Sequence, residues 1–300
     1  MKLNQLRDVI AIVERGSLRA AARHLGLAQP ALSRSIRELE RELNAPLFER
    51  RARGMILTPM GAAFIRRANV VLEEVRRARE EVAQLQGGVG GMIVAGLSIA
   101  AHLALLPDAL RPFRSRYPGV RLHLIEGLYP TLEFGLKDGS IDFYVGPRPE
   151  RALSADLVEE KLFDNTRTIL GRKGHPLSKA RSLRDLADAE WATTSITLEA
   201  EEELGAIFTN LKLPKPRLAL RSQSALTLIV SLAYTDLLAM VPAQWSSFDI
   251  TAQALAPIVV KETLSAPPLV MIRRGGLPLT PAAEFLVDLM RRRSQQQPLA

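Results

Sequence analysis

The sequence LAQPALSRSIRELEREL, residues 27–43, has the pattern of a helix with one apolar face and one basic face. Its apolar residues recur at helical spacing, which predicts a buried stripe of Leu32, Ile36, Leu39 and Leu43. Proline is tolerated in the first turn of a helix, so Pro30 places the helix start near Ala28 or Gln29. Packing does not explain the opposite face, which carries Gln29, Ser33, Arg34, Arg37 and Arg41.

The flanking residues predict a winged helix-turn-helix around this segment. A first amphipathic helix is indicated by Leu3, Leu6, Val9, Ile10 and Val13 and ends at Gly16, and Ser17 can cap a second helix to about Leu25. Residues 46–57, PLFERRARGMIL, predict two short strands around a basic tip. In a winged helix-turn-helix, the amino end of the helix within residues 27–43 would enter the major groove of DNA. The arginines of the wing suit contacts with phosphates or the minor groove, and here they are Arg50, Arg51 and Arg53. The alternative is a small helical domain whose arginines only solvate its surface.

Charge and composition agree with double-stranded DNA as a partner. Residues 1–90 hold 16 Lys and Arg against 10 Asp and Glu, whereas residues 91–300 hold 24 against 22. The chain has no cysteine and only four scattered histidines, so we expect no disulfide, thiol chemistry, cofactor or metal site. It opens with a polar helix and has no apolar run of about 18 residues, so we expect a cytoplasmic protein without a membrane partner.

A long helix is predicted after Thr58 and Pro59, which form a strong helix start. Its apolar residues alternate at spacings of four and three, as in a coiled coil: Phe64, Ala68, Val71, Val75, Ala78, Val82 and Leu85. The stripe is narrow for an ordinary core helix, so we favour self-association, which would hold two recognition helices about 34 Å apart on a palindromic site. The alternative is that the helix packs on its own chain. Gly87, Gly88, Gly90 and Gly91 then predict a hinge.

From Met92 onward, strands alternate with helices, which is typical of an open α/β sheet. We expect strands at 92–97, 120–125, 141–145, 167–170, 217–220, 237–241 and 269–272, and helices at 102–117, 131–137, 198–211, from 222 or 223 to 233, and after Thr280. Two α/β lobes would leave a cleft at the strand ends, where helix starts and hydroxyl groups suit an anion. Each such hydroxyl can equally be only a helix cap.

These residues identify the chain as similar to LysR-type transcriptional regulators over essentially its whole length. The specific motifs are Gly16-Ser17-Leu18, Ala20-Ala21-Ala22, Gln29-Pro30-Ala31-Leu32-Ser33, Pro46-Leu47-Phe48-Glu49-Arg50 and Leu57-Thr58-Pro59 with Gly61, and later matches include Leu106-Pro107, Tyr117-Pro118 and His175-Pro176-Leu177. The resemblance implies an α/β protein with an N-terminal winged helix-turn-helix (1–58), a linker helix and hinge (59–91), and a two-lobed, periplasmic-binding-protein-like effector domain (92–300). Lobe I would comprise about 92–163 and 267–300, and lobe II about 164–266.

The resemblance also implies roles for single residues. Gln29, Pro30, Ser33 and Arg34 would face the groove, with Arg37 and the wing arginines near phosphates, in a dimer or tetramer. One departure is Ala28, which stands where the family usually has a serine and so removes a helix cap typically worth about 1 kcal/mol.

A small-molecule effector is the second implied partner, and an organic anion is the best expectation. Candidates guided by the family are Ser98, Tyr129, Thr131, Ser195 and Ser222, with Ile99, His102, Phe143 and Gly146 lining the cleft and Arg148 as a counter-ion. Residues 126–130 with Asp138-Gly139 look most like members that sense aromatic acids or sulfonates. An exported solute-binding protein and an enzyme are the alternatives. The first lacks a signal peptide, and the second lacks a nucleophile with its base, so no catalytic residue is expected.

Overall fold

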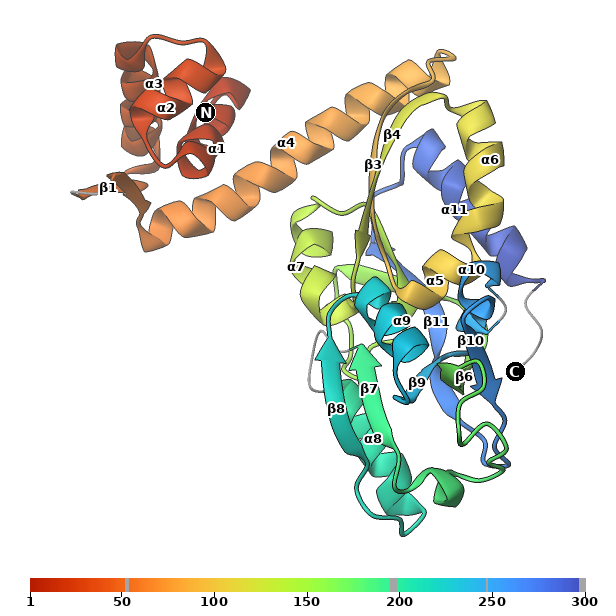
Figure 1. Cartoon of the computed structure of the whole chain (residues 1–300). Coiled ribbons are helices and arrows are strands. Elements are labelled where there is room, and N and C mark those ends of the chain that lie inside the picture. Colours follow the sequence, from red (N-terminus) through yellow and green to blue (C-terminus); the bar gives the residue numbers. More distant parts are fainter. Residues whose placement is uncertain (52–53, 195–198, 247, 297–300) are drawn as a thin grey trace.

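The computed structural model describes residues 1–51, 54–194, 199–246 and 248–296. It has the three parts expected: a small helical domain, one long helix and an α/β half (Figure 1). The small domain packs α1 (Leu3–Arg15), α2 (Leu18–Leu25) and α3 (Gln29–Leu43) around a shared apolar core. Gly16 and Gly26 end the first two helices at φ 70° and 67°, a conformation that favours glycine.

Two details of this core differ from the predicted apolar stripes. Leu32, Ile36 and Leu39 are buried, but Leu43 is exposed because it is the last residue of α3, before Asn44 turns the chain away. On α1, Leu3 and Val13 are exposed, and Gln5 and Asp8 are buried instead. Their polar groups are paired: Gln5 accepts from the Lys2 amide, and Asp8 accepts from the Ser35 hydroxyl and so ties α1 to α3.

The predicted wing is an antiparallel hairpin of β1 (Phe48–Arg51) and β2 (Gly54–Leu57), with Phe48 opposite Leu57. Glu40 of α3 fixes its base, because its Oε1 accepts from the amides of Leu47 at 2.7 Å and Phe48 at 3.2 Å. The wing is therefore held in a set position beside α3.

The linker helix α4 (Pro59–Leu85) has 27 residues, which corresponds to a length of about 40 Å. Thr58 caps it, and its Oγ1 accepts from the Gly61 amide at 2.9 Å. Figure 1 shows α4 running from the wing to the α/β half. The helix is therefore the long covalent connection between the two halves.

The α/β half is built on a sheet with the order β10-β6-β11-β5-β3-β4, and β9 also pairs with β6. We call lobe I the part around β3 (Gly90–Leu97), β4 (Gly119–Glu126) and β5 (Phe143–Pro147), which are parallel strands. One core cluster joins this sheet to α5 (Ile99–Ala104), α6 (Leu106–Arg116) and α11 (Pro281–Ser294), and another joins it to α7 (Tyr129–Asp138).

We call lobe II the part that contains the parallel pair β7 (Glu190–Thr194) and β8 (Arg217–Ser222), with β9 (Ala239–Pro242) and β10 (Leu255–Ile258). Its helices are α8 (Glu199–Asn210), α9 (Ala225–Tyr234) and the short α10 (Asp249–Ala252). The lobes are joined by two long antiparallel strands, β6 (Leu157–Arg172) and β11 (Ser265–Arg274). The first part of β6 pairs with β11 and its last part with β9 and β10, so β6 belongs to both lobes.

Several predicted elements have different bounds. The helix expected over 102–117 is two helices, α5 and α6, because the chain breaks at Leu105 and Pro107 lies in the first turn of α6. The strands expected at 167–170 and 269–272 are the inner parts of β6 and β11, and Pro267 and Pro268 lie inside β11 at a register shift. The cap of α9 is Ser224, whose Oγ accepts from the Thr227 amide.

Candidate functional site

The amino end of α3 is exposed, as the DNA-binding interpretation requires. Gln29, Pro30, Arg34 and Arg37 are exposed, and Ser33 is half-buried. Among the described residues, Arg34 has no ion-pair partner, whereas the Arg37 guanidinium donates to the Ser33 carbonyl at 3.2 Å. A free guanidinium at a helix start suits hydrogen bonding to a base edge. Ala28 is the N-cap and offers no side-chain hydrogen bond, as its sequence predicts.

The wing is less fully described. Arg50 and Arg51 belong to β1, and Arg53 lies outside the described residues. The base of the wing and α3 enclose a hollow lined by Ser33, Arg37, Phe48 and Met55, among others. The recognition helix and wing therefore form one continuous surface, and the DNA-contact roles of their residues stay predictions.

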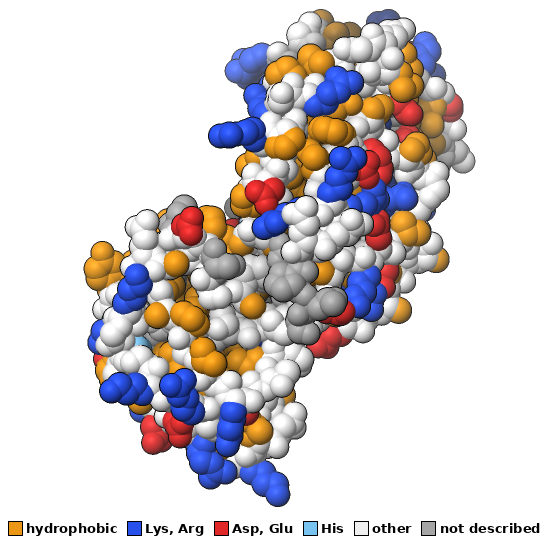
Figure 2. All heavy atoms as spheres, turned by 90° about the vertical axis from the view of Figure 1, so that its right-hand side faces the viewer, with side chains coloured by type: hydrophobic (Ala, Val, Ile, Leu, Met, Phe, Trp, Pro, Cys, Tyr) orange, Lys and Arg blue, Asp and Glu red, His pale blue; other side chains and the backbone are white. Residues whose placement is uncertain are grey.

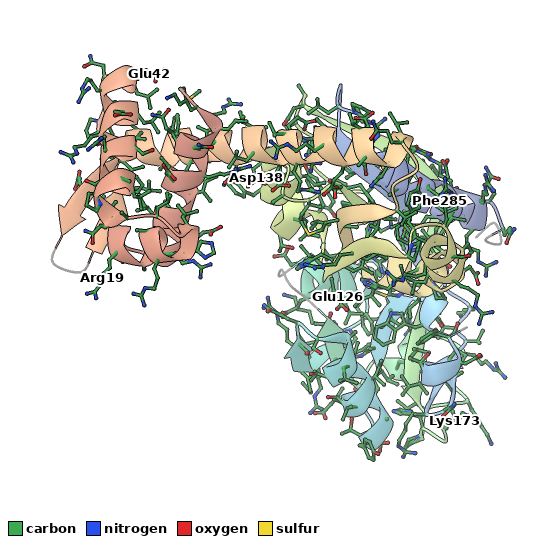
Figure 3. The ribbon with its side chains drawn as sticks, turned by 90° about the horizontal axis from the view of Figure 1, so that it is seen from above. Arg19, Glu42, Glu126, Asp138, Lys173 and Phe285 are labelled. Atoms are coloured by element: carbon green, nitrogen blue, oxygen red, sulfur yellow. The ribbon has the colours of Figure 1, made fainter. Side chains whose placement is uncertain are left out.

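The linker helix docks on lobe I through polar side chains that lie outside the predicted apolar seam. Arg77 is 5% exposed, and its Nε donates to Asp142 Oδ1 at 2.7 Å. Gln84 Oε1 accepts a hydrogen bond from the Ala282 amide at 2.9 Å, and Gln84 Nε2 donates to the Gly90 carbonyl at 2.9 Å. Figure 3 shows the labelled Asp138, at the end of α7, close to this helix. The hinge role of the glycine segment, which directly follows these contacts, stays a prediction.

Docking by one face leaves much of the apolar seam of α4 uncovered. Phe64 packs on the helix-turn-helix core and Ala68 is buried, but Val71, Ala78, Val82 and Leu85 are exposed. Residues two apart lie about 200° around a helix, so Val82 faces away from Gln84. The exposed seam is the surface on which a second helix can pack.

A cavity of about 160 Å³ lies between the two lobes. Lobe I contributes the start of α5 and the end of β4, and lobe II contributes β7, α8 and β9. Its apolar walls include Ile99, Leu128, Leu204, Met240 and Pro242, and its polar groups come from Ser98, Glu126, Arg167, Thr193, Glu203 and Gln223. Figure 3 shows Glu126 where lobe I meets lobe II. Apolar walls with a few polar groups are typical of a small-molecule site.

The predicted effector residues divide into those at the cavity and those elsewhere. Ser98 and Ile99 line it. His102, Tyr129, Thr131, Phe143, Gly146, Arg148 and Ser222 do not line it, and Ser195 lies outside the described residues. The roles assigned to these residues stay predictions.

Local packing explains why most of these side chains lie away from the cavity. Phe143 and Tyr129 are core residues at 0% and 2% exposure, and burial raises the pKa of Tyr129 to about 12. The Arg148 guanidinium pairs with Glu159 at 2.8 Å, and the Thr131 hydroxyl donates to the Leu128 carbonyl at 2.9 Å. A Cβ on Gly146 would meet the Tyr144 hydroxyl, so this glycine serves close packing.

Sequence reasoning missed the charged residues of the cavity. Arg167 was expected in a short strand and Glu203 in a helix, and nothing local in the sequence distinguishes them from surface charges. Their nearness depends on how β6 and α8 pack. Thr193 lies in β7 and lines the cavity, and it was not among the predicted effector residues.

Two further features, metal ligation and membrane-spanning helices, concern the part of the chain that the structure describes. There, no group of three or more His, Asp or Glu side chains could hold a metal ion. No described helix is both long and apolar enough to cross a membrane. Figure 2 shows basic, acidic and apolar side chains interspersed on one face of the molecule.

Comparison with known proteins agrees with this geometry. The family model "Bacterial regulatory helix-turn-helix protein, lysR family" matches residues 3–62, and "LysR substrate binding domain" matches residues 86–295. The SDS degradation transcriptional activation protein of Pseudomonas sp. is 31% identical over 294 residues, covering 96% of this chain and 95% of that protein. HTH-type transcriptional regulator GalR of Pseudomonas putida is 27% identical over 288 residues, covering 96% of this chain and 72% of that protein.

Solved structures show the same fold. Full-length CbnR, in a complex with its target DNA, superposes with a TM-score of 0.70 at 22% identity, over 98% of this chain and 100% of that one. A full-length OxyR variant from Pseudomonas aeruginosa gives 0.69 at 22% identity, over 97% and 98%. The matching families and relatives are transcriptional regulators and not enzymes. The chain therefore belongs to the LysR family of transcriptional regulators, with a DNA-binding helix-turn-helix domain and an effector-binding domain.

Proposed function

We propose that this regulator binds palindromic promoter DNA as a dimer or tetramer and changes its DNA contacts when a small organic acid enters the cavity between the lobes. The cavity is the observation that carries the proposal, because it combines apolar walls with an arginine where the lobes join. We further propose that domains 1–58, 59–91 and 92–300 act as reader, connector and sensor.

The size of the cavity favours an effector with a single ring. Its volume of about 160 Å³ is close to that of engineered apolar cavities of about 150 Å³, which accept benzene. An aromatic carboxylate or sulfonate matches this space and supplies the negative charge that Arg167 can bind. Alkyl sulfates are the second class to screen, because a 31% identical relative is named for SDS degradation.

The DNA-binding proposal is tested by replacing arginines along one face of α3. We expect Arg34→Ala to lose a base contact, which should cost about 1–3 kcal/mol and relax base preference at one operator position. Arg41→Ala is the matched control, because Arg41 lies two turns further along the same face and away from the amino end. Binding-site selection measures both. An unchanged base preference in Arg34→Ala would show that α3 is not oriented as proposed.

The self-association proposal is tested on the exposed seam. Val82→Glu should give monomers, because the carboxylate would be buried against the partner helix. Ala83→Glu adds the same charge at the next exposed position, off the seam, and should leave the oligomer intact. Analytical ultracentrifugation distinguishes them. An intact oligomer in Val82→Glu would place the subunit interface elsewhere.

A further inference from the structure

Two opposite charges meet at the wall of the cavity, across elements far apart in sequence. Arg167 of β6 is 14% exposed at its side chain, and Glu203 of α8 is 40% exposed. One Arg167 nitrogen, Nη2, donates to Glu203 Oε1, and the other, Nη1, donates to the Ser265 carbonyl of β11. The Arg167 amide also donates to the Leu264 carbonyl at 2.8 Å. The Arg167 guanidinium is thus held where β6 and β11 meet, and the side chain of its partner Glu203 is the more exposed of the two.

The charge balance of the cavity does not suit an added anion. Among the described lining residues, the charged side chains are Glu126, Arg167 and Glu203, which sum to one net negative charge. Among the described residues, the Glu126 side chain has no hydrogen bond or ion pair. An acid that entered beside both carboxylates would be repelled, and the only guanidinium among the described lining residues would already be occupied.

We propose that the anionic group of the effector takes the place of Glu203 on Arg167, while the Glu203 carboxylate turns into solvent. This inference rests on the proposed function, in which an organic acid occupies this cavity. The exchange keeps a counter-charge on Arg167 throughout, so no half-buried guanidinium is left unpaired. A guanidinium can also bind a carboxylate through two parallel hydrogen bonds. Glu203 receives only one bond from Arg167 Nη2, because Nη1 donates to the Ser265 carbonyl.

The exchange gives the effector a mechanical consequence. In the structure, Glu203 ties α8 of lobe II to β6, a strand that joins the lobes. Effector binding breaks this ion pair, and Arg167 then pairs with the anionic group of the effector instead of with α8. Glu203 therefore acts as an internal competitor that sets both the affinity for acids and the position of α8.

The test measures binding of sodium benzoate to the full-length protein by isothermal titration calorimetry. Glu203→Gln removes the competing charge and should tighten benzoate binding about tenfold relative to wild type. This gain in benzoate affinity should vanish in the double variant Arg167→Gln/Glu203→Gln. The double variant Arg167→Lys/Glu203→Gln should keep only part of the gain, because lysine retains the positive charge but cannot form the two parallel hydrogen bonds of a guanidinium. Glu202→Gln is the matched control, since Glu202 is exposed, adjacent and does not line the cavity.

Each outcome decides the matter. Equal or weaker benzoate affinity in Glu203→Gln, no heat at millimolar benzoate in any protein, or a gain that survives loss of Arg167 overturns the exchange. A promoter footprint of Glu203→Gln with and without benzoate separates the two proposals. Tighter, Arg167-dependent binding that leaves the footprint unchanged supports the exchange and refutes regulation through this cavity. A footprint that still responds to benzoate, with no tightening, refutes the exchange alone.

Discussion

Replacing Arg77 with methionine should loosen the linker helix from lobe I. Arg77 and Asp142 are 5% and 8% exposed, and Nε and Oδ1 are 2.7 Å apart. Arg77 Nη2 also donates to the Gly139 carbonyl, while Asp142 Oδ2 accepts from the Val94 amide at 2.8 Å. Methionine keeps most of the apolar stem but leaves a buried carboxylate with one remaining partner among the described residues.

The size of the effect follows from this burial. Removing one member of a buried ion pair typically costs about 3–5 kcal/mol, because the other charge stays desolvated. When α4 detaches from lobe I, Asp142 is exposed to water again, so the unpaired carboxylate destabilises only the docked state. The free energy needed to detach α4 therefore falls by the same amount. At tenfold per about 1.4 kcal/mol, opening becomes about 100- to 4000-fold more frequent.

Hydrogen–deuterium exchange of peptides within residues 70–85 measures that opening. The control is Arg79→Met, because Arg79 is exposed on the same helix, has no ion pair among the described residues, and should change stability by less than about 0.5 kcal/mol. If both variants exchange at the same rate, the ion pair does not hold the helix and the reasoning fails.

Three further predictions concern stability. Ala28→Ser supplies the missing cap of α3 and should stabilise the helix-turn-helix domain by about 1 kcal/mol, seen as a higher Tm; no change would mean that the serine does not cap. Gly61→Ala should destabilise the helix-turn-helix domain by about 1–3 kcal/mol and so lower its Tm, because the added Cβ would lie 2.0 Å from the Leu47 carbonyl oxygen; a wild-type melt would refute this. Burial alone would raise the pKa of Glu262, but hydrogen bonds from the Ser182 hydroxyl and the Leu183 amide lower this pKa overall. The ionised Glu262 therefore stabilises the fold above the unfolded pKa, and this stabilisation is lost as pH falls through the folded pKa. The Tm deficit of Glu262→Gln should accordingly be largest near neutral pH and shrink in acid, and a deficit independent of pH would contradict that linkage.

The helix-turn-helix was predictable because its signals are local. Gly16, Ser17, Gly26 and the apolar spacing of α3 act within one or two turns, and the structure follows them closely. Leu43 was misplaced because burial at the end of a helix depends on what lies opposite, which periodicity does not contain. The break between α5 and α6 carried a local signal in Pro107, which lies in the first turn of the second helix.

The cavity between the lobes was less predictable, since its charged and polar groups are assembled over long range. Ser98 could be expected, because it follows a predicted strand and starts a helix. Arg167 and Glu203 are separated by 36 residues and lie on different elements, so only the packing of α8 against β6 brings them together. Phe143 and Tyr129 follow the same logic in reverse, since a position near a strand end did not reveal that each side chain faces the core.

The sequence by itself determined the winged helix-turn-helix, the long amphipathic linker and the α/β class of the second half, because capping, periodicity and proline placement act over a few residues. Tertiary structure alone decided which face of the linker is free and which charges meet in the cavity. Arg77 looks like a surface residue until lobe I buries it against Asp142, and Arg167 looks like a strand residue until α8 supplies its partner. Both outcomes depend on desolvation by distant segments, a quantity that no local pattern encodes.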